Sequence, residues 1–285
     1  MWTFNKYIVI VAMLLLSTNL VTAQSADSVQ FCLPSRMIPT EELPFKATER
    51  LTYVLNYKWG PRLDVGEATI TLSEGKTRNG RKTFHAIAHG KTYRFWDMFF
   101  KVRDLYESQF YADNMKSFYF HRDVKEGGYE IKNFFYWNDE NHDINARIEL
   151  KNRPARDTIM KGRECTHDLL ALFYFARTIN FEEIKENTRY PISFVIDEEV
   201  YDMSFAYLGK EEKKIPVFGK CKTMKFAVKL VAGEVFTGKE DMIVWVTDDE
   251  NKVPLLFESP ILVGSIQGRL DSYKNLKHPI SAVVK

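Results

Sequence analysis

Alternation of apolar and polar residues runs through much of this chain, and it limits the fold more than any other feature. In residues 51–59 (LTYVLNYKW) every odd position is large and apolar, while three of the four intervening positions are polar or charged. Because successive side chains of a strand point to opposite faces, this spacing predicts a strand with one apolar and one wetter face. Residues 68–72, 144–150 and 222–232 repeat the pattern.

Short turn sequences separate these segments. Asn79-Gly80 suits a tight hairpin, because both residues tolerate a positive φ. Residues 126–128 (EGG) and 248–251 (DDEN) are further turn signals. We count about 12–14 strands on these signals, and their short connections predict antiparallel neighbours. Hydrophobic residues make up 45% of the chain and aromatic residues 14%, which is enough for a packed core.

Two segments depart from the two-residue period. Residues 95–101 are dense in aromatic residues without alternation, and they predict a short helical turn before a strand over 102–111. Residues 166–178 predict an amphipathic helix with Thr166 as its N-cap and Asp168 in its first turn. Its apolar positions are i, i+3, i+4 and i+7, namely Leu169, Leu172, Phe173 and Ala176. We therefore expect a mainly β protein, an antiparallel β-barrel or strongly curved sheet with one amphipathic helix.

The first 23 residues have the composition of a secretory signal peptide. Lys6 precedes an apolar run over 8–16, and Val21-Thr22-Ala23 is a small-residue cleavage box, so we expect cleavage near Ala23. The alternative is a retained N-terminal anchor, but a spanning helix needs roughly 17–25 apolar residues. The mature protein is therefore predicted to be periplasmic or otherwise exported, without a transmembrane segment.

No composition change divides the remainder of the chain. Residues 24–44 hold three prolines and show no period, which indicates an N-terminal leader or linker. Residues 45–285 are predicted to form a single β-rich domain. Loss of Lys6 with the signal peptide leaves 39 basic and 38 acidic residues, and this balance removes any general electrostatic case for nucleic acid or an anionic membrane as a partner.

Three cysteines follow the predicted cleavage point. An oxidising compartment allows one disulfide among Cys32, Cys165 and Cys221 and leaves one thiol. We favour Cys32 with Cys221, which would join the N-terminal segment to a late strand, although sequence leaves the connectivity open. Their spacings contain no CxxC motif.

An ordered set of sequence blocks resembles a bacterial exported family, domain of unknown function 3108. The blocks are residues 51–60 with 66–68, 101–108 (KVRDLYES), 122–129 (RDVKEGGY), and 244–254 (VWVTDDENKVP) through 263–266. The resemblance covers nearly the whole mature chain. It implies a periplasmic β-rich protein, similar in fold to small lipid-binding barrels of the YceI-like or lipocalin-like kind, and it supplies no catalytic residues.

The sequence gives no basis for a catalytic or metal site. His85 and His89 are four residues apart in a predicted strand, where that separation spans about 13 Å, too far for one ion. Residues 248–251 lack the ligand pattern of a calcium loop. A G-x-S-x-G elbow is absent from the sequence. We predict a protein that is not an enzyme and uses no cofactor or metal.

Charged and aromatic residues on the strands are the candidate ligand-binding groups. Arg103 and Arg122 each precede an aspartate within a strand, so one member of each pair faces each side. A charge inside a barrel could orient a ligand headgroup, although we favour cross-strand ion pairs on the wet face. The aromatic candidates, which would fill the interior or line an apolar cavity, are Tyr53, Tyr57, Trp59, Phe135, Trp137 and Trp245.

Two functions follow from this interpretation. The first is an exported, non-catalytic binding module that shelters a lipid or another apolar small molecule inside the barrel. The alternative is a structural or interaction protein with a solid core, which contacts an envelope protein as an accessory in cell-envelope or outer-membrane assembly.

Overall fold

The structure is a computed structural model, and it describes residues 32–33, 36–58, 62–229, 241–260 and 265–284. The predicted signal peptide (1–23) and Trp59 lie outside the described residues.

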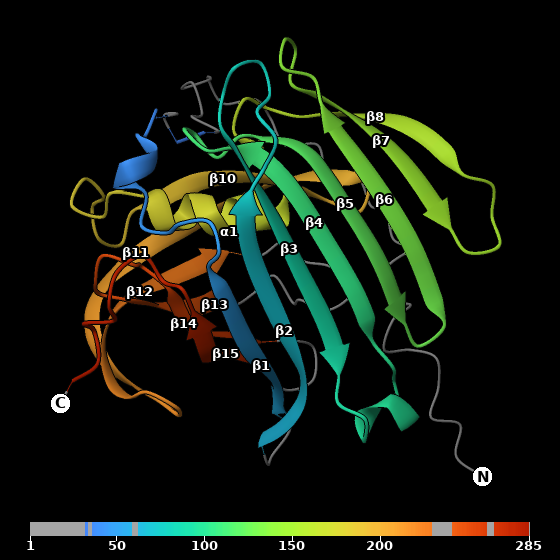
Figure 1. Cartoon of the computed structure of the whole chain (residues 1–285). Coiled ribbons are helices and arrows are strands. Elements are labelled where there is room, and N and C mark those ends of the chain that lie inside the picture. The colour runs from blue at the N-terminus through green and yellow to red at the C-terminus, as the bar shows by residue number, and fades with distance from the viewer. Residues whose placement is uncertain (1–31, 34–35, 59–61, 230–240, 261–264, 285) are drawn as a thin grey trace, which may run out of the picture.

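One 15-stranded sheet contains all the strands of the described residues, and it curves strongly around a single α-helix (Figure 1). Its order is β8-β7-β6-β5-β4-β3-β2-β1-β15-β14-β13-β12-β11-β10-β9, so β1 and β15 pair near its middle. The elements are η1 (Thr40–Glu42), β1 (Arg50–Lys58), β2 (Arg62–Glu74), β3 (Thr83–Thr92), η2 (Trp96–Met98), β4 (Arg103–Tyr111), β5 (Ser117–Glu126), β6 (Tyr129–Trp137), β7 (Asp143–Leu150), β8 (Arg156–Lys161), β9 (Thr166–His167), α1 (Leu169–Thr178), β10 (Arg189–Ile196), β11 (Glu199–Ile215), β12 (Gly219–Lys229), β13 (Met242–Thr247), β14 (Pro254–Pro260) and β15 (Ser265–Lys274).

The predicted curved antiparallel sheet with one helix is confirmed. Asn79 and Gly80 have φ values of 51° and 73°, as the hairpin between β2 and β3 requires. The structure has more strands than we expected, and β9, only two residues long, is too short to produce a period. Among the described strands, β9 and β10 form the one parallel pair, because α1 connects them.

Helix α1 begins later than predicted. Thr166 is not its N-cap, because this residue pairs with Ser193 of β10 and its Oγ1 lies 2.8 Å from the Ser193 hydroxyl. Asp168 caps the helix instead. Its Oδ1 accepts hydrogen bonds from the backbone N–H groups of Leu170 and Ala171, at 2.9 and 3.0 Å.

Helix α1 occupies the concave side of the sheet, between the wall of β1–β8 and the wall of β10–β15 (Figure 1). Tyr174 is fully buried, and its ring centroid lies 4.8 Å from that of Phe45 and 5.8 Å from that of Phe110. Leu43 is also fully buried, so the end of the predicted leader belongs to the core. Aromatic side chains therefore fill this part of the concave side.

Side chains join the two ends of the sheet. Arg122 of β5 forms an ion pair with Asp197 in the turn between β10 and β11. The indole Nε1 of Trp137 donates to the carbonyl oxygen of Thr166 at 3.0 Å. Val195 packs in the same apolar cluster as residues of β5 and β6. Two more ion pairs across this junction are Arg156–Glu198 and Arg163–Asp202.

The predicted disulfide is wrong. Cys32 bonds to Cys165, just before β9, with 5.6 Å between their Cα atoms. Cys221 is buried in β12, where it pairs with Val283 from the C-terminal segment, and its thiol is free. The bridge closes a loop with a sequence separation of 133 residues. A loop this long corresponds to a stabilisation on the order of 5 kcal/mol in the chain-entropy description.

A buried ion pair connects α1 to both walls. The two terminal nitrogens of Arg177 donate to the two carboxylate oxygens of Glu49, at 2.5 and 3.0 Å. Nε and Nη2 of Arg177 also donate to the carbonyl oxygen of Asn251, at 3.2 and 2.9 Å. Glu49 immediately precedes β1 and Asn251 lies in the turn between β13 and β14. Both charged side chains are at most 1% exposed.

Replacing Arg177 with methionine should lower the free energy of unfolding by about 3–5 kcal/mol, because Glu49 would be left buried without its counter-charge. Urea denaturation measures the change. The matched control is Arg189→Met, which breaks an ion pair with Asp241 at the surface and should cost less than about 1 kcal/mol. Equal losses in the two variants would contradict the proposed importance of the buried pair.

Candidate functional site

Three of the predicted ligand-binding aromatics belong to the packed core. Tyr53 faces the concave side, where its ring centroid lies 6.5 Å from that of Phe173 of α1. Its hydroxyl donates to the carbonyl oxygen of Pro254 at 3.0 Å, so it already has a partner. Phe135 is fully buried and Trp137 nearly so, within one cluster. These side chains fill the interior of the fold and do not line a cavity.

The other two described aromatics are Trp245 of β13 and Tyr57 of β1. Register pairs Trp245 with Leu256, Leu256 with Arg269, and Arg269 with Val54, so Trp245 lies on the face opposite to Tyr53. The Nζ atom of Lys213 lies 3.7 Å from the centroid of its indole ring. Trp245 is nevertheless only 5% exposed and belongs to the same buried apolar cluster as Tyr53, so its indole ring is packed and does not line a cavity. Tyr57 is half-buried near the end of β1.

The two candidate arginines have different structural roles. Arg122 faces the concave side and is buried, and its Nε donates to Oδ1 of Asn133 at 2.6 Å. With its ion pair to Asp197, it helps to join the ends of the sheet. Arg103 lies on the other face of the sheet and binds Asp97 of η2. Neither is a cross-strand ion pair on the wet face, because each partner comes from a turn or loop.

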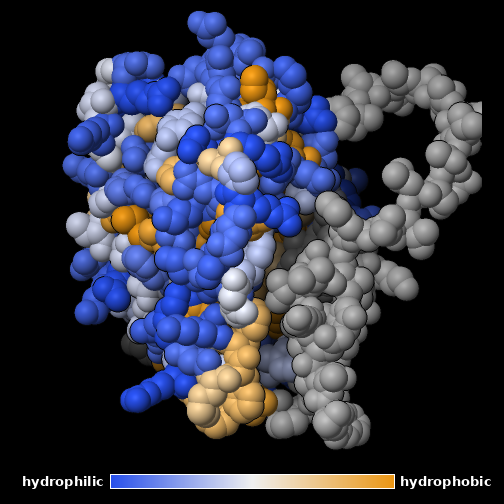
Figure 2. Space-filling view, turned by 90° about the vertical axis from the view of Figure 1, so that its right-hand side faces the viewer, coloured by the Kyte–Doolittle hydropathy of each residue, from blue (hydrophilic) through white to orange (hydrophobic). Residues whose placement is uncertain are grey.

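An exposed apolar loop, which we had not predicted as a site, connects β3 to β4. We call residues 93–101 (YRFWDMFFK) the aromatic loop. Its side chains Phe95, Met98 and Phe99 are 60%, 72% and 71% exposed. Figure 2 shows a projecting apolar patch at the lower end of the molecule, where β3 and β4 meet this loop in Figure 1. Exposed apolar patches of this kind commonly mark interaction sites.

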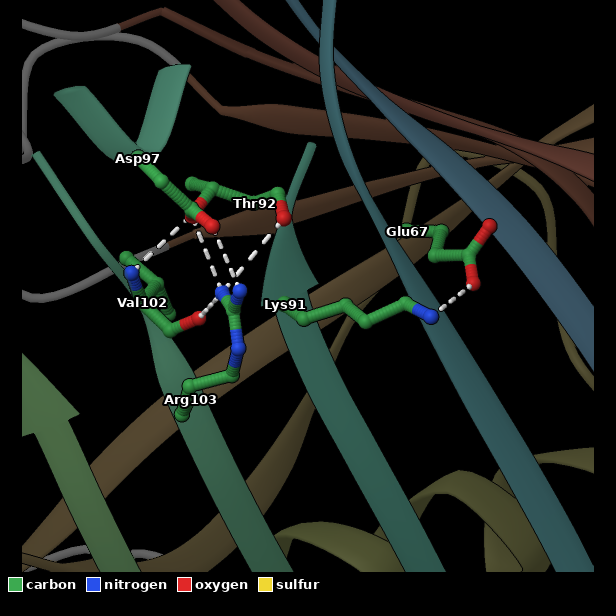
Figure 3. Close-up of polar contacts among 6 residues, drawn as sticks. All are labelled: Glu67, Lys91, Thr92, Asp97, Val102 and Arg103. Atoms are coloured by element: carbon green, nitrogen blue, oxygen red, sulfur yellow. Dashed lines mark hydrogen bonds and ion pairs between the residues drawn. The ribbon is translucent and has the colours of Figure 1, made fainter. Parts of the chain in front are cut away.

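Polar contacts fix the loop to the ends of β3 and β4 (Figure 3). Arg103 donates from Nη1 and Nη2 to the carboxylate of Asp97, at 3.0 and 2.6 Å. Thr92 donates its hydroxyl to Asp97 at 2.5 Å and accepts from the backbone N–H of Val102 at 3.0 Å. The hydrogen bonds from Arg103 and Thr92 lower the pKa of Asp97 to about 2.

Two further aromatics of the loop, Trp96 and Phe100, are held by contacts outside it. The indole Nε1 of Trp96 donates to the carbonyl oxygen of Asp64 in β2, at 2.9 Å. Phe100 lies against Gly127, where a Cβ atom would come within 2.3 Å of its ring. Gly127 also has a φ of +55°, so glycine serves both the turn and this contact. The loop thus presents three apolar side chains from a fixed backbone.

A sequence model of the family described as protein of unknown function (DUF3108) matches residues 52–271. The chain belongs to this family. No curated protein matches it.

Two solved structures are similar to this DUF3108 chain. A β-barrel-like protein of the domain of unknown function DUF1849 from Brucella abortus aligns with a TM-score of 0.51 and 9% identity, over 85% of this chain and 99% of that one. A protein with a YmcC-like fold from Bacteroides fragilis aligns with a TM-score of 0.31 and 9% identity, over 85% and 100%. The first likeness supports the fold alone. Among the described residues, none of the helices has the length and apolar character needed to cross a bilayer.

A second polar cluster has the composition of a hydrolytic triad but the geometry of a helix cap. Ser108 and Ser117 both donate to Oδ2 of Asp168, at 2.7 Å. His167 instead contacts the carbonyl oxygen of Met115 through Nδ1, at 3.0 Å. Burial lowers the pKa of His167 to about 4, which keeps the ring neutral. These contacts hold the start of α1 against β4 and β5.

A titratable carboxylate lies near the aromatic loop. Register places Asp104 of β4 opposite Gly90, on the concave face. Its Oδ1 accepts from the backbone N–H of Lys125 at 3.1 Å. Burial, aided by the nearby charge of Glu126, raises the pKa of Asp104 to about 7.

Loosening the polar anchor should release the loop without unfolding the sheet. We expect Asp97→Ala to speed chymotrypsin cleavage within residues 93–101, because Arg103 and Thr92 lose their shared partner. Cleavage sites are identified by mass spectrometry, and the thermal midpoint should change little. Lys91→Ala is the control, because it breaks a nearby ion pair with Glu67 that does not contact the loop (Figure 3). Equal cleavage of both variants would contradict this anchoring role.

The raised pKa of Asp104 predicts a pH dependence of stability. Its charged form is disfavoured by folding, so its contribution is favourable at low pH and is lost as pH rises from about 4 through about 7. Asp104→Asn should flatten the unfolding free energy over this window, as measured by urea denaturation. Asp157→Asn, at an exposed position of β8, should leave the wild-type profile unchanged. Parallel profiles for wild type and Asp104→Asn would contradict the shift.

Proposed function

We propose that this DUF3108 chain is an exported, non-catalytic docking module, which attaches to an apolar surface of the cell envelope through its aromatic loop. The observation that carries the proposal is the exposure of Phe95, Met98 and Phe99 on a loop whose backbone is fixed. The Cys32–Cys165 disulfide supports an oxidising compartment outside the cytoplasm.

The packing of the concave side supports docking over sheltering of a ligand. Tyr53, Phe135 and Trp137 were candidates for a cavity lining, yet each packs within an apolar cluster. Arg122, the candidate for a ligand headgroup, is bound by Asn133 and Asp197. Residues on the rim of the sheet therefore offer the better binding surface.

A carrier for a lipophilic ligand is the second candidate function. One observation favours it: the Tyr174 hydroxyl and the Asn133 amide nitrogen are buried without a hydrogen-bond partner in the part of the chain that the structure describes. A polar ligand end could satisfy such groups. Native mass spectrometry of protein purified from its own compartment should show the bare mass if docking is the function, and a co-purified lipid would favour the carrier.

Co-sedimentation with purified envelope membranes tests the docking function. We expect Phe95→Ser/Met98→Ser/Phe99→Ser to weaken binding at least about tenfold, because burial of even one such side chain contributes about 1.5–3 kcal/mol. The control is Ile159→Ser/Val217→Ser, which removes two exposed apolar side chains outside the loop. Unchanged sedimentation of the triple variant would refute the proposal.

A further inference from the structure

We infer that the aromatic loop inserts into the interface of an anionic phospholipid bilayer. This inference rests on the proposed docking function and names its partner. Three properties of the loop support a bilayer: the small size of its apolar tip, the charges beside that tip, and the arrangement of aromatic residues behind it.

The apolar tip is small for a protein partner. Three side chains with the exposures of Phe95, Met98 and Phe99 present on the order of 400 Å² of apolar surface. A standard protein interface buries about 800 Å² on each partner, roughly twice the area of this tip. A bilayer sets no such requirement, because a few aromatic and aliphatic side chains suffice for interfacial insertion when electrostatic attraction assists them.

Two cations lie beside the tip. Arg94 and Lys101 are both exposed, and neither forms an ion pair within the described residues. They border one shallow hollow together with Phe95, Asp97 and Met98. The negative charge of Asp97 is matched by Arg103, so the loop presents two uncompensated positive charges next to apolar side chains. This combination complements lipid phosphates above an acyl layer.

Trp96 and Phe100 lie behind the tip and limit the depth to which it can enter a bilayer. The indole of Trp96 is half-buried, with its Nε1 bound to Asp64, and Phe100 rests on Gly127. The tip can therefore enter the acyl boundary while the polar ends of β3 and β4 remain at the headgroup level. Tryptophan is favoured at this depth, because its ring is apolar and its N–H is polar.

Vesicle flotation of the full mature protein tests the inference. Vesicles of phosphatidylethanolamine with about one-quarter phosphatidylglycerol are compared with vesicles of phosphatidylcholine alone. Wild type should float with the anionic vesicles and bind the neutral ones less tightly, and added salt should weaken the anionic binding. Phe95→Ser/Met98→Ser/Phe99→Ser should abolish flotation.

The charge component has its own matched pair of variants. Arg94→Ser/Lys101→Ser should bind anionic vesicles about tenfold to thirtyfold more weakly, since each cation near such a surface strengthens binding about fivefold or slightly less. The control is Lys76→Ser/Lys82→Ser, which removes two exposed cations at the opposite end of the hairpin formed by β2 and β3. Thermal midpoints of all four proteins verify that each is folded.

Two results would overturn the inference. One is equal flotation of wild type and Arg94→Ser/Lys101→Ser, and the other is failure of wild type to float with anionic vesicles. If wild type fails to float yet still sediments with envelope membranes, and protease treatment of those membranes abolishes binding, the partner is a protein and the docking function survives. If wild type binds neither, both the inference and the docking function fail.

Discussion

The ion pair between Arg177 and Glu49 is the interaction on which the arrangement of this fold depends. It joins the last turn of α1 to the start of β1 and, through the Asn251 carbonyl, to the turn between β13 and β14. Desolvating two charges is costly, and the cost is offset only by bidentate geometry with all donors directed at acceptors. The helix is therefore held at one depth and orientation, and the two walls of the sheet curve around it.

Because the concave side is packed with side chains, its packing determines where the protein can bind a ligand or a partner. Aromatic rings of α1, Phe45 and β4 fill one part of it, and the junction formed by Arg122, Asp197 and Val195 covers another. Polar groups that could have recognised a ligand thus hold the two ends of the sheet together. Because the side chains that connect the two ends of the sheet are already engaged with one another, they are not available to a ligand. The loops at the rim of the sheet remain available to interact with other molecules.

Sequence predicted the features that depend on local chemistry. The period-two pattern, the Asn79-Gly80 turn and the presence of a helix, which the structure places at Leu169–Thr178, each follow from the preferences of neighbouring residues. The disulfide was wrong, because it depends on distant parts of the chain, and so does the face on which Trp245 lies. Irregularities in the pairing of β1, β13 and β14 change which residues face inward, and alternation within one strand cannot reveal them.

The aromatic loop also combines a feature that local sequence reveals with one that depends on tertiary contacts. Its composition was visible in the sequence, but a run of aromatic residues without a period is equally compatible with a buried turn. The hydrogen bonds of Asp97, Arg103 and Thr92 fix the backbone of the loop, and Gly127 leaves room for the ring of Phe100. If burial were the purpose of this segment, a looser loop could fold Phe95, Met98 and Phe99 onto the sheet. Fixed polar contacts instead hold these side chains in water, at a cost in solvation that binding to an apolar surface would recover.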